Sequence, residues 1–289
     1  MALADIFLKE KKPERGLLAA EWFTIAYVVF TLLMWGVYRM MPCRLTLLLR
    51  IVAQMSFLGW WYPDTYELNR LLPNLDHLFA SMEQGLFGCQ PSLLFSQVVP
   101  YAWFSELMCL GYVSYFPLIA LVSLYYFVAR YQEFKMATFV ILVSFFIYYF
   151  IFVLLPVTGP QFYYLAVGTE KIAAGVFPNL GDWFMMHSER MAAPGWSDGF
   201  WYHILDLAHD AGERPTAAFP SSHVGITTVL MMLALRTRCR WLIFTILPFY
   251  ILMCFATVYI YAHYVIDALA GLITGIALYY ILCFLYKRT

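Results

Sequence analysis

Two short stretches of the sequence combine histidine with other side chains suited to catalysis. The first is Pro220-Ser221-Ser222-His223, at the start of an apolar run. Proline is favoured as the first residue of a helix, so we expect a helix to begin at Pro220 and to hold the next three residues in its first turn. The free backbone N–H groups of a first turn bind anions. This stretch therefore predicts an anion site, for a group such as phosphate, that also offers two hydroxyl groups and an imidazole.

The second stretch places a histidine and an aspartate four residues apart, as His263 and Asp267. This spacing puts both side chains on one face of a helix. The carboxylate can then accept the proton of one ring nitrogen and leave the lone pair of the other nitrogen directed at a substrate, as in a catalytic triad. The spacing predicts an oriented, nucleophilic histidine.

Both stretches belong to a chain with the composition of an integral membrane protein, because 63% of its residues are hydrophobic and only 12% are charged. Apolar runs that approach the length of a membrane span, about 20 residues, occur near residues 17–38, 45–62, 102–129, 135–156, 219–236, 241–259 and 263–286. The runs 219–236 and 241–259 are expected to cross the membrane in opposite directions, so the chain returns to the same membrane level. We therefore expect His223 and His263 to meet at one membrane face.

The distribution of basic residues predicts the topology. The short connections 130–135 and 236–240 are basic, which makes them cytoplasmic and puts residues 157–218 on the extracytoplasmic face. Seven spans would leave the basic N-terminus outside, whereas six leave it inside; its basic residues are Lys9, Lys11, Lys12 and Arg15. We prefer six spans, with the weakest run, 45–62, in the membrane interface or re-entrant, and seven is the alternative. The first apolar run has no small-residue cleavage site after it, so we expect an uncleaved helix.

The expected fold class is an all-α integral membrane protein, a bundle of six or alternatively seven transmembrane helices with extracytoplasmic loops over the active site. We divide it into an N-terminal transmembrane region, residues 1–130, with a loop at 63–101, and a catalytic transmembrane core, residues 131–289, with a loop at 157–218. The second loop is rich in aromatic residues, which favour the headgroup level of a bilayer. It is either a lid over a lipid site or an ordinary aromatic belt. Four loop histidines without a companion motif are expected to be solvated or lid residues: His77, His187, His203 and His209.

Charge and cysteine patterns argue against other classes of protein. The formal net charge is zero, with 18 basic and 18 acidic residues, so no basic surface for nucleic acid is indicated. The cysteines lack CxxC spacing and support neither a disulfide framework nor a zinc site. Two histidines and an aspartate can bind iron or zinc, but their spacing is not that of a usual metal motif, so we expect no metal and no cofactor. A transporter would also place histidine and aspartate in the membrane; it stays an alternative, although no paired half-repeats are visible.

The two stretches resemble motifs of the membrane branch of the phosphatidic-acid-phosphatase type 2 superfamily, which shares its site with vanadium haloperoxidases. That family has three motifs: Lys-x6-Arg-Pro, Pro-Ser-Gly-His and Ser-Arg-x5-His-x3-Asp. Residues 220–223 match the second motif with Ser222 in place of glycine, and His263 with Asp267 matches the core of the third. The resemblance covers roughly residues 135–286.

Other positions depart from the family pattern. Ala256-Thr257 stand where the third motif has Ser-Arg, and Leu207 stands where the first motif has lysine ahead of Arg214-Pro215. These departures, together with a His-Tyr-x-x-Asp third motif, resemble the sphingolipid synthase branch, especially inositol phosphorylceramide synthases. Residues 155–161 are similar to the proline-rich stretch that replaces the first motif in that branch; the alternative is a simple helix stop.

The resemblance implies a role for each matching residue. His263 would attack phosphorus and form a phosphohistidine, Asp267 would orient it, and His223 would protonate the leaving alcohol. Ser221 and Ser222, with the nearby N–H groups, would hold the phosphate oxygens.

Three further residues are expected at the site. Arg214 is the candidate to replace the missing family arginine, because a guanidinium presents a fork of donors to phosphate; an ordinary loop charge is the alternative. Gln161 and Tyr264 are expected substrate contacts.

The function that follows is a membrane phosphotransferase that moves a phospholipid headgroup, such as phosphoinositol, onto a lipid alcohol such as ceramide. The alternative is a lipid phosphate phosphatase, in which water replaces the acceptor. The expected partners are phospholipid and lipid-alcohol substrates and the membrane, and nothing indicates nucleic acid; the oligomeric state does not follow from the sequence. We expect the active site on the extracytoplasmic face, periplasmic or lumenal, of a bacterial inner membrane.

Overall fold

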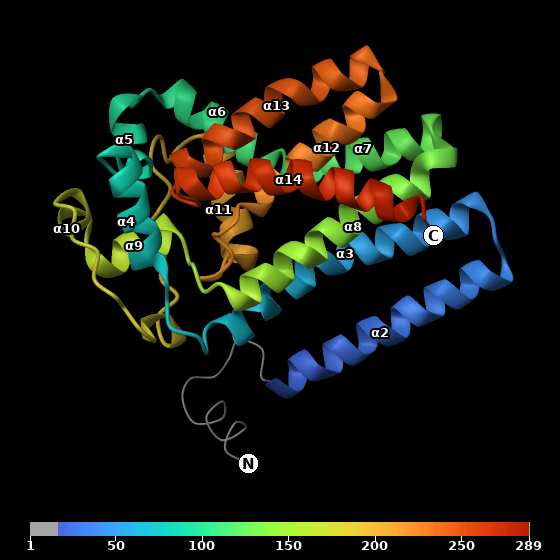
Figure 1. Ribbon diagram of the computed structural model, residues 1–289, viewed down its shortest axis with the longest axis horizontal. Coiled ribbons are helices and arrows are strands. Elements are labelled where there is room, and N and C mark those ends of the chain that lie inside the picture. Colours follow the sequence, from blue (N-terminus) through green and yellow to red (C-terminus); the bar gives the residue numbers. More distant parts are fainter. Residues whose placement is uncertain (1–16, 289) are drawn as a thin grey trace. The chain divides into compact units, whose positions relative to one another are not determined.

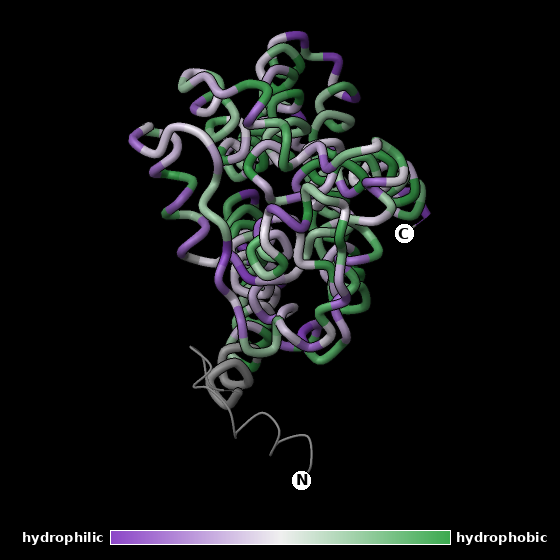
Figure 2. The backbone as a smooth tube through the Cα atoms, turned by 90° about the vertical axis from the view of Figure 1, so that its left-hand side faces the viewer, coloured by the Kyte–Doolittle hydropathy of each residue, from purple (hydrophilic) through white to green (hydrophobic). Residues whose placement is uncertain are grey.

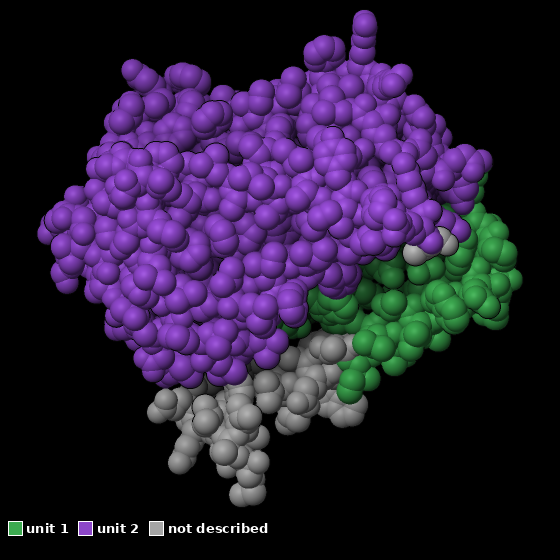
Figure 3. Space-filling model, viewed as in Figure 1, with its two compact units in different colours: residues 1–64 green, residues 65–289 purple. Residues whose placement is uncertain are grey.

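The chain forms two compact units, residues 1–64 and 65–289 (Figure 3). The computed structural model describes residues 17–288, and the side chains of residues 25–210 and 212–288. The first unit contains α2 (Leu17–Met40) and most of α3 (Arg44–Asn69). The basic residues Lys9, Lys11, Lys12 and Arg15, on which the predicted orientation of the N-terminus depends, lie outside the described residues. The functional division at residues 130 and 131 stays a prediction.

The second unit is a set of helices, and no strand occurs among the residues described (Figure 1). Its elements are α4 (Asp76–Phe87), α5 (Pro91–Val98), α6 (Ala102–Val113), α7 (Tyr115–Ala129), α8 (Tyr131–Leu154), α9 (Pro160–Val167), α10 (Thr169–Ala173), the 3-10 helix η1 (Trp183–Met185), α11 (Phe200–Gly212), α12 (Ser222–Thr237), α13 (Arg240–Tyr259) and α14 (Val265–Tyr286). The all-helical fold class is confirmed for these residues.

Three of these helices, α8, α13 and α14, are long and apolar enough to cross a membrane. The predicted run 102–129 is α6 and α7, which are bent by 46° at Ser114 and count as a fourth span if the pair is one. Figure 2 shows hydrophobic residues along the helical coils and hydrophilic ones recurring where the chain turns. The protein is therefore an integral membrane protein.

The count of six or seven spans is not confirmed. The predicted run 219–236 forms α12, which has 16 residues and is shorter than a full span. The predicted run 45–62 is part of α3, one continuous helix of 26 residues that contains Pro63. By length and composition alone, the described residues give three or four spans.

Helices α12 and α14 lie side by side (Figure 1), and glycines make their close approach possible. A Cβ atom on Gly275 would lie 2.5 Å from the carbonyl oxygen of Gly225, and one on Gly271 would collide with the carbonyl oxygen of Ser221. Small residues let membrane helices pack backbone against backbone. The approach brings Ser221 to the first turn of α14, where its N–H donates to the carbonyl oxygen of Asp267 over 3.0 Å.

The two predicted loops contain several short helices, and four of these lie at one end of this unit. Helices α4, α5, α9 and α10 lie at the end where α14 begins (Figure 1). A buried apolar cluster joins them, with Phe79 from α4, Tyr163 and Tyr164 from α9, and Tyr264 at the start of α14. The segments 63–101 and 157–218 therefore support the first turn of α14 from outside the apolar helices.

Candidate active site

The two predicted histidines lie close together. The ring centroids of His223 and His263 are 5.8 Å apart, and the ring planes are inclined at 59°. His223 is the second residue of α12, whereas His263 precedes α14 by two residues. His263 and Asp267 therefore do not share a helix face as predicted, because the helix begins only after the Tyr264 cap. His263 is buried and His223 is partly buried. The packing of α12 against α14 thus brings the two motifs into one site.

The first turn of α12 differs in detail from the prediction. The helix begins at Ser222, not at Pro220, because Ser221 serves as its N-cap: the Ser221 Oγ accepts from the N–H of Val224 at 3.4 Å. Serine is preferred at this position because its oxygen satisfies an N–H of the first turn. Within the described part of the chain, the N–H groups of Ser222 and His223 have no acceptor. They are therefore available to an anion.

A backbone hydrogen bond determines which nitrogen of His263 is reactive. Its Nδ1 lies 2.8 Å from the carbonyl oxygen of Ala218. A carbonyl only accepts, so Nδ1 carries the proton and Nε2 has the free lone pair. Burial lowers the pKa of His263 to about 4, against the opposing effects of the Ala218 bond and of Glu213. At neutral pH the ring is uncharged, as a nucleophile must be.

Asp267 does not make the predicted hydrogen bond to His263. Its Oδ2 lies 3.8 Å from Nδ1 of the histidine and accepts instead from the backbone N–H of Tyr264 at 2.8 Å. The reason is local, since a carboxylate at the third position of a helix folds back to cap the helix start. The other oxygen, Oδ1, is buried and has no hydrogen-bond partner in residues 17–288. Asp267 is a nearby acidic group, and the bond that orients the ring comes from Ala218.

Two tyrosines enclose the ring of His223. Tyr112 stacks on it at a centroid distance of 4.5 Å and an angle of 28°, and Tyr115 packs at 4.4 Å and 43°. The Nδ1 atom of His223 is buried and has no hydrogen-bond partner among the residues that the structure describes. The ring is thus held by its faces.

His209 differs from the prediction of a solvated or lid histidine. It is 3% exposed, and within the described part of the chain neither of its ring nitrogens has a hydrogen-bond partner. The ring packs edge-on against Tyr112 at 5.6 Å, so one tyrosine contacts both His209 and His223. Burial, and secondly the charge of Arg190, lowers the pKa of His209 to about 4. His203, on the same helix α11, is exposed, as predicted.

Glu213 belongs to no sequence motif, yet it interacts electrostatically with His263. Gln161, a predicted substrate contact, donates from Nε2 to Glu213 Oε1 over 2.9 Å, and its backbone N–H donates to the carbonyl oxygen of Tyr261. Burial raises the pKa of Glu213 to about 7, and the charge of His263 is the strongest opposing effect. The sequence signal that could have indicated Glu213 as a site residue is its position directly before Arg214.

The raised pKa of Glu213 predicts a pH-dependent stability. Between its ordinary value of 4.5 and about 7 the folded protein keeps a proton that the unfolded chain loses, so this group destabilises the fold increasingly as the pH rises through that range. We expect Glu213→Gln to raise the apparent melting temperature by about 2–4 °C at about pH 8 and to change it little at about pH 4.5. Thermal scans of both proteins at the two pH values test this.

Glu170 is an exposed acid on α10 and provides the control. Glu170→Gln should have the same small effect at both pH values. A melting-temperature difference for Glu213→Gln that did not change with pH would contradict the assignment.

The other predicted site residues have these positions. Ser221 and Ser222 are buried at the start of α12. Arg214 is partly buried, and its Nη1 donates to the carbonyl oxygen of Glu213 over 2.9 Å. Tyr264 is fully buried, and its hydroxyl donates to Asp76 Oδ1 over 3.1 Å. The hydroxyl of Tyr264 is therefore engaged by the protein.

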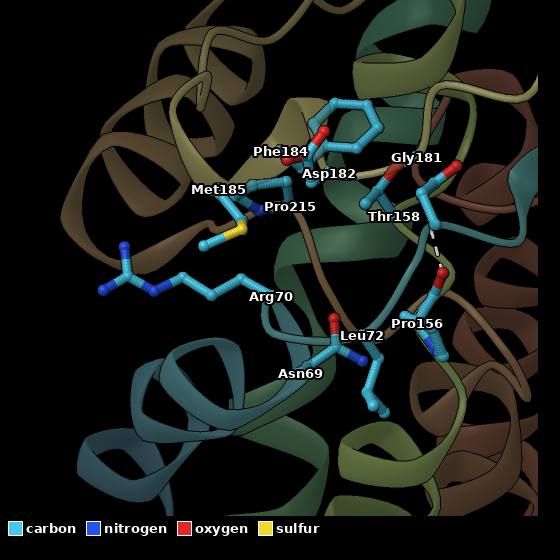
Figure 4. A pocket seen from close by; sticks show the side chains of 11 residues that line it. Asn69, Arg70, Leu72, Pro156, Thr158, Gly181, Asp182, Phe184, Met185 and Pro215 are labelled. Atoms are coloured by element: carbon cyan, nitrogen blue, oxygen red, sulfur yellow. Dashed lines mark hydrogen bonds between the residues drawn. The ribbon is translucent and has the colours of Figure 1, made fainter. Parts of the chain in front are cut away.

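Two cavities differ in size and lining. One cavity, of about 10 Å³, has room for about one water molecule. Its lining includes Pro156 and Thr158 (Figure 4). The other is an apolar cavity of about 630 Å³ between α5, α12, α13 and α14. Its lining includes Val224, next to His223, and Val265, two residues after His263. Of these two cavities, the apolar one is large enough for part of a lipid.

The apolar helices define an integral membrane protein. A comparison with known protein families identifies the superfamily to which it belongs. The family model described as the PAP2 superfamily matches residues 77–281. The chain belongs to the PAP2 superfamily, whose members are phosphatases or phosphotransferases. The matched region begins within α4, so it includes a helix that the motifs alone left out. Comparisons with curated proteins and with solved structures found no match.

Proposed function

We propose that this protein is a membrane phosphotransferase, which moves a phospholipid headgroup such as phosphoinositol onto a lipid alcohol such as ceramide. The observation that carries the proposal is the pairing of His223 and His263, 5.8 Å apart between ring centroids, with the lone pair of His263 Nε2 free. One histidine can attack phosphorus while the other handles the proton of the alcohol.

The reaction has two half-reactions. In the first, Nε2 of His263 attacks phosphorus, the bond from phosphorus to the diacylglycerol oxygen breaks, and protonated His223 gives its proton to that oxygen. In the second, His223 takes the proton of the acceptor hydroxyl, whose oxygen attacks phosphorus and displaces His263. Both histidines return to their starting states.

Charge on the phosphate oxygens needs donors in fixed positions, which supply most of the catalysis in phosphoryl transfer. The N–H groups of Ser222 and His223, the hydroxyls of Ser221 and Ser222, and the guanidinium of Arg214 are the groups assigned to this task. Asp267 stabilises the positive charge of the phosphohistidine.

The lipid character of the substrate is supported by the apolar cavity of about 630 Å³, whose lining includes Val224 and Val265 from the first turns of α12 and α14. A hydrocarbon chain in that cavity would leave the headgroup phosphate near the starts of α12 and α14. Basic connections at the opposite ends of the helices favour an extracytoplasmic active site, and we assign the protein to a bacterial inner membrane.

Hydrolysis is the competing reaction, because water can displace His263 from the same phosphohistidine. Ser222, and Ala256-Thr257 in place of Ser-Arg, favour transfer, since these departures resemble the sphingolipid synthase branch. The test is an assay of the purified protein with a headgroup-labelled phospholipid, with and without ceramide. Label that joins a new lipid only when ceramide is present supports transfer. Label released as a water-soluble phosphate in both reactions would establish the phosphatase.

Arg214 is expected to contribute to phosphate binding. Arg214→Ala should lower kcat/KM for lipid turnover about tenfold or more, which corresponds to about 1.4 kcal/mol of transition-state stabilisation. Steady-state kinetics of the purified variant measure this. Arg240→Ala, at an exposed position at the other end of α12 and α13, is the matched control and should behave as wild type. Unchanged turnover in Arg214→Ala would make the arginine an ordinary loop charge.

A further inference from the structure

Helix α4 carries two carboxylates that are completely buried. Asp76 is its first residue and Glu83 lies seven positions later, on the same face, and both side chains are 0% exposed. Within the described residues neither forms an ion pair. Burying a carboxylate without a cation is unfavourable unless hydrogen bonds compensate. The hydrogen-bond donors to these two carboxylates therefore show which parts of the structure the carboxylates hold in place.

Asp76 receives hydrogen bonds from the segment Thr158-Gly159, from Asn74, and from Tyr264, the residue after His263. Its Oδ2 accepts from the N–H and the hydroxyl of Thr158, at 2.7 and 2.9 Å, and from Asn74 at 2.6 Å. Its Oδ1 accepts from the N–H of Gly159 at 2.9 Å and from the hydroxyl of Tyr264 at 3.1 Å.

Gly159 links this network to the residue just before the nucleophile. It has a φ of 92°, and a Cβ atom there would lie 2.6 Å from the carbonyl oxygen of Ala262. The backbone that Asp76 anchors is thus packed directly against Ala262. Since Tyr264 is also bonded to Asp76, one carboxylate fixes structure on both sides of His263.

Glu83 anchors the start of α14. Its Oε1 accepts from the N–H of Val265 and its Oε2 from the N–H of Ile266, each at 3.1 Å. These are the first two residues of the helix, whose N–H groups have no partner within it. Burial raises the pKa of Glu83 to about 7, and the two N–H bonds oppose this effect. A group from a distant helix thus completes the cap to which Asp267 contributes locally.

We propose that Asp76 and Glu83 are positioning residues, which hold the backbone on both sides of His263 so that Nε2 is aligned for attack on phosphorus. A nucleophile displaced by about 1 Å loses much of its rate, so the anchoring acts on the chemical step more than on substrate binding. The inference rests on the proposed role of His263. It extends the active machinery to α4, outside both sequence motifs.

The test is single-turnover labelling of His263 in the full-length protein, with a phospholipid carrying labelled phosphate and no acceptor alcohol. Glu83→Gln keeps an acceptor for one N–H and loses the other, and we expect it to slow labelling about tenfold or more. Tyr264→Phe removes only the bond to Asp76 and should slow it about threefold. The KM for the phospholipid and the final amount of label should stay within about twofold of wild type in both variants. Glu83→Asp keeps a carboxyl group with two oxygen acceptors and should recover part of the rate that Glu83→Gln loses.

Thermal unfolding of each variant shows whether the fold is intact, and Glu170→Gln, at an exposed acid, should match wild type in all measurements. Labelling of both α4-network variants at the wild-type rate would overturn the inference alone. The inference would also be overturned if a smaller folded fraction fully explained the rate loss, or if the substitutions changed only KM. Wild-type protein that takes up no label on His263 would overturn the proposed function and this inference together.

Discussion

His263→Ala is expected to abolish lipid turnover while the protein stays folded. The substitution removes the only group assigned to attack phosphorus, so the rate should fall about a thousandfold or more, which corresponds to about 4 kcal/mol. Turnover of a labelled phospholipid by the purified variant measures this. The same protein should take up no label at position 263, as mass spectrometry of the wild-type and variant proteins will show.

Two controls separate loss of chemistry from loss of structure. His203→Ala changes an exposed histidine of α11 and should retain wild-type turnover. Because His263 is buried, His263→Gln serves as a second variant that keeps most of the side-chain volume and a donor for Ala218. Wild-type rates in either His263 variant would exclude the phosphohistidine mechanism.

His223→Asn should lower kcat by about a hundredfold to ten-thousandfold with a natural phospholipid. The leaving alkoxide of diacylglycerol is strongly basic, so its departure requires a proton from His223. A substrate whose leaving group is a nitrophenol departs without that proton. The rate loss should therefore be much smaller with a nitrophenyl phosphodiester, and comparison of the two substrates measures the difference.

His223 also packs between Tyr112 and Tyr115, so a structural contribution must be distinguished from the proton transfer. Tyr115→Phe keeps the ring contact and should preserve the ratio of rates for the two substrates. An equal rate loss with both substrates in His223→Asn would contradict the role of general acid.

Much of the framework could be predicted from the sequence. Long apolar runs identified α8, α13 and α14 as membrane helices, because span length and composition are local properties. The meeting of His223 and His263 was predicted from the two apolar runs 219–236 and 241–259, which were expected to lead the chain away and back, although α12 is shorter than a full span. These arguments needed no knowledge of which side chains touch.

The details of the site could not be predicted in the same way. The pattern of α11 does not distinguish buried His209 from exposed His203, because both lie on a helix whose packing partners are far away in sequence. The expected bond from Asp267 to His263 was plausible from spacing alone, but the carboxylate has a nearer donor in the backbone of Tyr264. Glu213, Asp76 and Glu83 belong to no motif and gain significance only from their contacts.

The sequence by itself determined that this is a helical membrane protein of the PAP2 superfamily with a histidine at or just before the start of each of two helices, since composition, spacing and motifs are properties of the chain. Tertiary structure decided that Ala218 orients His263. It also decided that Glu83 of α4, about 180 residues earlier in the chain, caps α14, the helix that follows His263. The physical reason is that an N–H, a carbonyl or a carboxylate bonds to whatever partner packing brings within about 3 Å. Here α12 packs closely against α14 at their glycines, and α4 is buried against the start of α14. This packing determines which hydrogen-bond partners these groups have.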